Sequence, residues 1–326
     1  MKPLVFASST SEAFTRDGFA DATFDFAFFR FVWGPQPSSD ELAHFLGPYT
    51  SGHDRGRHWS IWCGPWKKYR DKDRRELSLA DFCRHYESVE LWFDIRPEAQ
   101  LKQVWLLDYF RSYPEIVAKL KLRLIAFELI MWNGAKSWQP PVFNVTEKDL
   151  ATASAAWQAY RSSTPEACVD LLQRDLSALP LLKPALLDLL EELPAASTGL
   201  GASEMRMLEL ISWGYANVNP LFHHQDLRQT RVFSEWEYGY LLDGLAFGPQ
   251  PAIAGHDEEL RTIPRDNIGA RHQAMLRSRF TLTDFGKAVV AHKEDFSRHN
   301  PIDRWWGGTH LTNDNLWRWS PALLKP

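Results

Sequence analysis

The sequence predicts an α/β fold in its first part and a mainly helical fold in its second. Over residues 1–140, short apolar runs alternate with helix-like segments, and strands joined through helices run parallel. The runs are mainly apolar rather than strictly alternating, which is typical of strands buried on both faces. We therefore expect a Rossmann-like or flavodoxin-like sheet over 1–140. The composition changes at Gln139-Pro140-Pro141, which places a second domain at 141–326.

The elements of the first domain follow from local signals. Gly34-Pro35 ends one apolar run, and Pro97 begins the longest helix, as proline does at first helical positions. The predicted strands are 3–8, 27–33, 88–94 and 121–127. The predicted helices are 11–18, 39–46, 78–86 and 97–111.

The sequence predicts that the second domain is a series of helices with capping residues at their starts. Thr146 can cap a helix that ends near 161, Thr164-Pro165-Glu166 begins the next helix, and Ser234-x-x-Glu237 is a capping box. The remaining segments are a helix at 180–193, a linker at 194–202, helices at 203–213, 219–229 and 234–247, a polar loop at 248–270, a strand at 279–282, and a helix from Thr283 to about 293. This order is winged-helix-like, an analogy of element order alone.

Composition limits the class of protein. The chain has 326 residues, 44% hydrophobic and 24% charged, and a formal net charge of -4, so we expect a globular protein without a basic surface throughout. Its cysteines, Cys63, Cys83 and Cys168, are sparse, odd in number and widely spaced, which favours a reducing compartment. No apolar run is long enough for a signal peptide or a membrane span. We therefore expect a cytoplasmic protein.

Two motifs carry a resemblance to a known family. The run FTLTDFGKAVV (280–290) and the tail DRWWGGTHLTNDNLWRW (303–319), together with the strand end Leu91-Trp92-Phe93-Asp94, resemble a bacterial family of domains of unknown function. The first loop departs from that family, with Ala7-Ser8-Ser9-Thr10 where an Asn-Gly-Asp-Ser-like turn is expected. The resemblance implies an architecture and brings no activity.

The carboxyl edge of the sheet is the first candidate site, because ligands of parallel sheets bind there. Its ligand-binding candidates are Ser8, Ser9, Thr10 and Ser11, whose hydroxyls could hold a phosphate at a helix N-terminus. Asp94, Arg96 and Glu98 follow the third strand, and Asp94 or Glu98 is a candidate general base. No glycine-rich phosphate motif is present, so these residues serve equally well as helix caps.

A basic and aromatic stretch is the second candidate. Residues 55–75 contain eight Lys or Arg against two acids, with Trp and Tyr interleaved, a mixture that suits phosphates and stacked bases. The alternative is a solvated loop whose indoles point inward. The ligand-binding candidates here are Arg55, Arg57, Trp59, Lys67, Lys68 and Arg70.

The C-terminal tail is the third candidate. It contains four Trp residues, and the side chains of Arg304, His310 and Arg318 could bind an anion. The same residues could instead fasten the chain end, with Gly307-Gly308 as a tight turn and the indoles as anchors. We favour this structural interpretation for most of the Trp residues.

Other signals are negative or weak. Val232–Leu260 has no Lys or Arg against six acids, so helix 234–247 is not expected to bind double-stranded DNA, and an acidic surface at 235–259 could bind a protein. The pairs His53/His58 and His223/His224 lack a metal-ligand spacing, and we expect no metal. The leading hypothesis is a binding or regulatory protein for a nucleotide, a phosphorylated ligand or single-stranded nucleic acid. The alternatives are an enzyme acting on a phosphate-containing small molecule and a protein-interaction adaptor; the cofactor is left unknown.

Overall fold

A five-stranded sheet lies at the centre of the first part of the chain. The computed structural model describes residues 3–7, 18–24, 34–50, 58–61, 76–125, 141–229 and 232–326. In this part of the chain the strand order is β2-β1-β3-β4-β5; the first four strands are parallel and β5 is antiparallel to β4. The order 2-1-3-4 is that of flavodoxin-like sheets. The predicted α/β fold with a mostly parallel sheet is confirmed.

Three strands lie where the sequence predicts them. These are β1 (Leu4–Ala7), β3 (Val89–Phe93) and β4 (Leu120–Leu124). Two further strands, β2 (Ala22–Phe24) and β5 (Val142–Asn144), were not predicted. All three residues of β5 are exposed, so this edge strand lacks the apolar run that reveals a buried one. The predicted strand 27–33 lies outside the described residues, as does all of the predicted helix 11–18 except Gly18.

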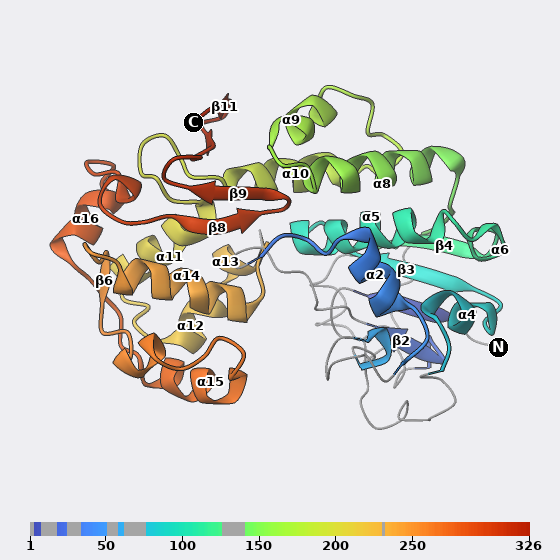
Figure 1. Ribbon diagram of the computed structural model, residues 1–326, viewed down its shortest axis with the longest axis horizontal. Helices are drawn as coiled ribbons and strands as arrows, with labels where there is room; N and C mark the ends of the chain where they lie inside the picture. The colour runs from blue at the N-terminus through green and yellow to red at the C-terminus, as the bar shows by residue number, and fades with distance from the viewer. Residues whose placement is uncertain are drawn as a thin grey trace. The chain divides into compact units, whose positions relative to one another are not determined.

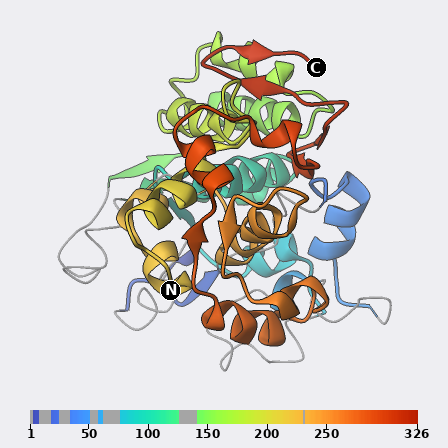
Figure 2. The ribbon, with the colours of Figure 1, turned by 90° about the vertical axis from the view of Figure 1, so that its left-hand side faces the viewer.

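In the described residues, four helices precede β5. They are α2 (Ser39–Leu46), α4 (Leu79–Arg84), α5 (Pro97–Phe110) and α6 (Pro114–Val117), with a 3₁₀ turn η1 at Trp59–Ile61. Ser38 and Glu41 form a capping box at the start of α2, and Ser78 caps α4. Eleven of the fourteen residues of α5 are buried. Figures 1 and 2 explain this, because α5 lies between the sheet and α8 (Glu147–Tyr160).

Aromatic rings fill the space between the sheet and the elements around α4 and α5. Phe6 of β1 contacts Phe24 of β2 and Phe110 of α5, with ring centroids 5.4 and 5.9 Å apart. Phe24 also contacts Trp59, which packs on Phe82 of α4 with centroids 5.3 Å apart. Burial of such large side chains is the main stabilising contribution to a core of this kind.

The described chain divides into two compact units. Of the described residues, unit 1 contains β1 to β5, the helices α2, α4, α5 and α6, all of α8 except Tyr160, and the segment Leu171–Ala185. Unit 2 contains 34–35, Tyr160–Asp170 and Leu186–Pro326. Two helices, α9 (Glu166–Leu172) and α10 (Leu182–Glu191), share their residues between the units. Because β5 pairs with β4, residues beyond the predicted boundary at 140 take part in the sheet of unit 1. Among the described helices, none is long and apolar enough to cross a membrane.

Unit 2 is mainly helical, as predicted. Its helices are α11 (Ala202–Ser212), α12 (Val218–Phe222), α13 (Gln225–Gln229), α14 (Glu235–Phe247), α15 (Ile268–Arg277) and α16 (Asp284–Val290). The predicted capping box of Ser234 and Glu237 begins α14, and Thr283 caps α16. The predicted polar loop 248–270 is only partly a loop, because it contains the strand β6 (Ile253–Ala254), the 3₁₀ turn η3 (Glu258–Arg261) and the start of α15. β6 pairs with β7 (Thr281–Leu282).

Candidate functional site

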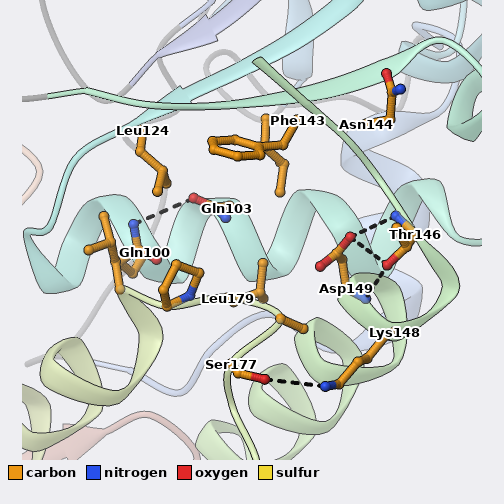
Figure 3. Close-up of a pocket in the computed structure, with 14 residues that line it drawn as sticks. Gln100, Gln103, Leu124, Phe143, Asn144, Thr146, Lys148, Asp149, Ser177 and Leu179 are labelled. Atoms are coloured by element: carbon orange, nitrogen blue, oxygen red, sulfur yellow. Dashed lines mark hydrogen bonds between the residues drawn. The ribbon is translucent and has the colours of Figure 1, made fainter. Parts of the chain in front are cut away.

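A cavity of about 400 Å³ opens in unit 1 beside the last two strands of the sheet (Figure 3). Its walls come from α5, β4, β5, the start of α8 and the segment 177–181. Most small-molecule sites are concave, largely apolar, and carry a few well-placed polar groups. A volume near 400 Å³ lies within the range of such sites.

Apolar side chains form two walls of the cavity. Leu122 and Leu124 lie on the face of β4 that turns toward α5, and Phe143 of β5 pairs with Leu122. Leu179 and Pro180 come from the segment that follows α9, and Figure 3 shows Leu179 across from Leu124 and Phe143. Phe143 is 48% exposed, so its ring is available to a molecule in the cavity.

Two glutamine amides from α5 form the polar part of the lining. Gln100 is 1% exposed, and its Nε2 donates a hydrogen bond to the carbonyl oxygen of Asp94 at 2.6 Å. Gln103 is 2% exposed, and its Oε1 accepts only a long contact of 3.4 Å from Gln100 Nε2. The Nε2 atom of Gln103 donates to no residue that the structure describes.

The unused amide of Gln103 faces the cavity. Its Nε2 atom is not among the fully buried side-chain atoms that lack a partner, so this N–H group reaches the open space of the cavity. Figure 3 shows Gln103 projecting from α5 on the side of Leu124 and Phe143. A ligand that accepts from Nε2 would satisfy this donor.

Charged residues lie at the α8 end of the cavity. The hydroxyl and amide of Thr146 each donate to Asp149 Oδ2 at 2.7 Å, and Asp149 N donates back to the Thr146 hydroxyl, which confirms the predicted cap. Lys148 Nζ lies 2.8 Å from Asp175 Oδ2 and donates to Ser177 Oγ at 3.2 Å. The hydrogen bond from Lys148 lowers the pKa of Asp175 well below its usual range. Because both partners are exposed, this ion pair is weak and an anionic ligand group could replace Asp175.

The predicted site at the carboxyl edge of the sheet has a different arrangement. Asp94 is 1% exposed, and Arg96 Nε lies 2.9 Å from each of its carboxylate oxygens. Arg96, not Asp94, is the N-cap residue of α5 and makes no side-chain cap bond. Glu98 is paired with Lys102 at 2.9 Å. Both carboxylates thus have cationic partners and neither is placed as a free general base; Ser8, Ser9, Thr10 and Ser11 lie outside the described residues.

Trp59 is not a surface residue, which corrects its assignment to an exposed aromatic surface. It is 1% exposed, packs on Phe24 and Phe82, and donates from Nε1 to the carbonyl oxygen of Leu77 at 3.1 Å. A base cannot stack on a ring that the core already covers. The other candidates of the basic stretch, Arg55, Arg57, Lys67, Lys68 and Arg70, lie outside the described residues.

The tail is held to unit 2 by an ionic cluster. Arg304 Nη1, on β8 (Asp303–Trp306), lies 2.5 Å from Glu204 Oε2. Glu204 also accepts from Gly201 N, and Glu192 accepts from the amide and hydroxyl of Ser203, so two carboxylates cap the start of α11. Burial raises the pKa of Glu192 to about 7, against the hydrogen bonds from Ser203 and the charge of Arg304. Arg304 therefore has a structural partner in Glu204, while its Nη2 atom is buried without a partner among the described residues.

The rest of the tail forms a hairpin with the same role. β8 pairs with β9 (Thr309–Thr312), and the turn between them fits against the end of α8: Gly308 N donates to Tyr160 O at 3.0 Å. A Cβ on Gly308 would lie 1.9 Å from the carbonyl oxygen of Arg161, so only glycine fits. Trp306 is 4% exposed and donates to Leu189 O at 2.6 Å. The indole and the glycine pair thus act as anchors, as expected.

The two remaining tail candidates also have protein partners. Arg318 donates to Ala195 O at 2.9 Å and to Asp295 Oδ2 at 3.0 Å. His310 is exposed; its Nε2 lies 2.8 Å from Asp303 Oδ1, and its ring stacks on Trp305 with centroids 4.6 Å apart. These contacts hold the hairpin and the chain end in place.

The acidic segment 235–259 is largely neutralised by arginines. Glu237 is 1% exposed within the cap of α14. The other pairs are Asp243 with Arg271, Asp257 and Glu259 with Arg277, and Glu258 with Arg261. The segment 235–259 therefore does not present an acidic surface of uniform negative charge. Arginines that follow it in the sequence pair with most of its carboxylates.

Histidines in the described residues have ordinary partners. His58 is buried between Ser60 Oγ and the carbonyl oxygen of Gly47, at 2.7 and 2.9 Å. His223 contacts Asn219 O, and His224 lies 3.8 Å from Asp226. Within the described ranges, no three His, Cys, Asp or Glu side chains are grouped to hold a metal ion.

No protein-family model and no characterised protein sequence matches the chain. The cavity of unit 1 and its chemistry are therefore the basis for a functional proposal.

Proposed function

We propose that this protein binds a nucleotide or another small phosphorylated ligand in the cavity of unit 1. The observation that carries the proposal is the amide of Gln103, whose Nε2 has no described protein partner and opens onto a cavity of about 400 Å³. A ligand in the cavity that accepts a hydrogen bond can pair with this donor. The cavity has room for one nucleotide-sized molecule rather than for a strand.

The anionic part of the ligand is assigned to the exposed end of the cavity. Lys148 lies there in a weak, exposed ion pair with Asp175. The Lys and Arg residues of the basic stretch 55–75 lie outside the described residues, so this assignment rests on Lys148. Binding through exposed cations falls with rising salt.

The enzymatic alternative has less support. Its two candidate bases, Asp94 and Glu98, are already paired with Arg96 and Lys102. Because the oxygens of these carboxylates already accept hydrogen bonds from cationic partners, they are poorly placed to accept a substrate proton. We therefore propose binding rather than catalysis.

We also propose a winged-helix-like arrangement for unit 2 and a cytoplasmic location for the protein. The three helical segments α11, α12–α13 and α14, followed by the β6–β7 pair, support a winged-helix-like arrangement, with α15 inserted between the strands. Helix α14 carries no Lys or Arg, so we do not propose double-stranded DNA as its partner. The buried free cysteines Cys83 and Cys168 support a cytoplasmic location.

Isothermal titration with ribonucleoside monophosphates, ribose 5-phosphate and a short single-stranded DNA oligomer tests the proposal. At about 50 mM salt we expect the monophosphates to bind, and more weakly at about 200 mM. Lys148→Met should weaken monophosphate binding by up to about fivefold, as removal of one exposed charge does. Lys183→Met is the matched control, because Lys183 is exposed and does not line the cavity.

The result that would overturn the proposal is equally specific. Absence of binding by any phosphorylated probe, or affinity that is independent of both salt and Lys148, would exclude a phosphate contact at this end of the cavity. Binding of the oligomer alone would move the function to single-stranded nucleic acid and away from the cavity.

A further inference from the structure

We infer that the part of the ligand that enters the cavity is a flat heterocycle with a hydrogen-bond acceptor on its edge, such as a nucleobase. This inference rests on the proposed function and deepens it. It assigns the ring to the Gln103 end of the cavity and the phosphate to the Lys148 end.

The direction of the amide network leaves a donor for the ligand. Asp94 O can only accept, so its 2.6 Å bond identifies the nitrogen of the Gln100 amide. The same nitrogen faces Gln103 Oε1 at 3.4 Å, which turns the Gln103 nitrogen away from Gln100. The ligand must therefore offer an acceptor, such as a ring nitrogen or a ring carbonyl, to this N–H group.

The charges of the lining keep a phosphate away from the Gln103 end. Of the described residues that line the cavity, only Lys148 and Asp149 are charged. Lys148 lies beside Ser177, at the other end from Gln103 in Figure 3, and Asp149 would repel an anion. A phosphate beside Gln103 would thus lose its hydration without meeting a cation, which is costly.

The apolar walls exclude two other occupants of the inner cavity. Leu122 and Leu124 on one side and Leu179 on the other cannot satisfy the several hydroxyls of a sugar. An alkyl chain would fit these walls but would leave the Gln103 donor unused. A heterocycle matches both, because its faces are apolar, its edge accepts a hydrogen bond, and Phe143 can contact its ring.

Saturation-transfer NMR on the unmodified protein gives the first test. With adenosine and uridine monophosphates as probes, we expect stronger saturation of the base protons than of the ribose protons. Equal or greater saturation of the ribose, or no transfer to any heterocycle, would overturn the inference. This measurement needs no variant and so is unaffected by folding defects.

Substitution of the amide gives the second test. Gln103→Glu keeps the length of the side chain but replaces the donor by an acceptor, and should weaken monophosphate binding about tenfold or more. Gln173→Glu makes the same change at an exposed position outside the cavity and should leave binding unchanged. Equal affinities of the two variants would contradict the inference.

A second site covers the case in which Gln103→Glu fails to fold. Phe143→Ala removes a wall of the cavity from an exposed strand, and should weaken binding severalfold. Val142→Ala alters the exposed neighbour, which does not line the cavity, and serves as its control. Unchanged binding by Phe143→Ala would count against a ring at this position.

The outcomes also separate this inference from the proposed function. If nucleosides bind in a Gln103-dependent way and phosphate adds nothing, the ring assignment stands and the phosphate proposal fails. If phosphorylated probes bind through Lys148 but respond to neither Gln103 nor Phe143, the proposed function stands and the ring assignment fails.

Discussion

We predict that Glu192→Gln removes a pH dependence from the stability of unit 2. Glu192 is 5% exposed and lies at the start of α11, where it accepts hydrogen bonds from Ser203. Burial raises the pKa of this carboxyl to about 7, from an ordinary value of 4.5. The hydrogen bonds from Ser203 and the charge of Arg304 oppose the rise without cancelling it.

The sign of the effect follows from proton binding in the two states. Between pH 4.5 and 7 the folded protein holds a proton that the unfolded chain has already lost. The stabilisation is therefore fully present below the unfolded pKa and is lost as the pH rises through the folded pKa. Over that window the free energy of unfolding should fall by about 3 kcal/mol, because each pKa unit corresponds to about 1.4 kcal/mol.

Urea unfolding at about pH 5 and about pH 8, followed by hydrogen exchange in α10 and α11, measures this difference. The parent protein should lose about 3 kcal/mol relative to Glu192→Gln between the two pH values. Glu191→Gln is the matched control, since Glu191 is the exposed neighbour, and it should follow the parent. If the parent and Glu192→Gln show the same pH dependence, Glu192 is ionised in the folded protein and the reasoning is wrong.

Three further substitutions test the tail and the cavity. Gly308→Ala should destabilise unit 2 by more than about 2 kcal/mol in thermal unfolding, because its Cβ would lie 1.9 Å from a backbone oxygen. Gly269→Ala is the control and should not destabilise unit 2 in this way, because no atom lies within 4 Å of the Cβ that it adds. Trp306→Phe should cost about 1–3 kcal/mol, since it removes the hydrogen bond to α10 and leaves a gap. Gln103→Leu should change the stability of the ligand-free protein by less than about 1 kcal/mol in urea unfolding, because the amide faces the cavity and makes only a 3.4 Å contact with the protein. A larger loss would mean that the amide is already bonded within the protein.

Local signals located most of the elements. Thr146 and Ser234 cap the helices that the sequence assigned to them, because a cap depends on residues three positions apart. The buried strands β1, β3 and β4 were visible as apolar runs for the same local reason. Exposed β5 was missed because its place in the sheet depends on pairing with a distant strand.

The cavity could not be located from the sequence, although one signal for it was present. In α5, apolar residues occur on all sides of the helix, which indicates a helix buried all round and therefore buries Gln100 and Gln103 as well. Which of the two amides finds a partner depends on the carbonyl oxygen of Asp94, and this is set by how the chain turns after β3. The sequence directed attention instead to Asp94 itself, whose charge Arg96 already neutralises.

The sequence by itself determined the α/β class, the helix caps and the anchoring role of the tail, because these depend on periodicity, neighbouring residues and the large apolar area of tryptophan. Tertiary structure alone decided the partners of the charged and polar side chains. It paired Arg304 with Glu204, covered Trp59, neutralised the acids of 235–259 with later arginines, and left the Gln103 donor without a described partner. The physical reason is that a hydrogen bond or ion pair acts over a few ångströms, and residues far apart in sequence reach that distance only when the chain has folded.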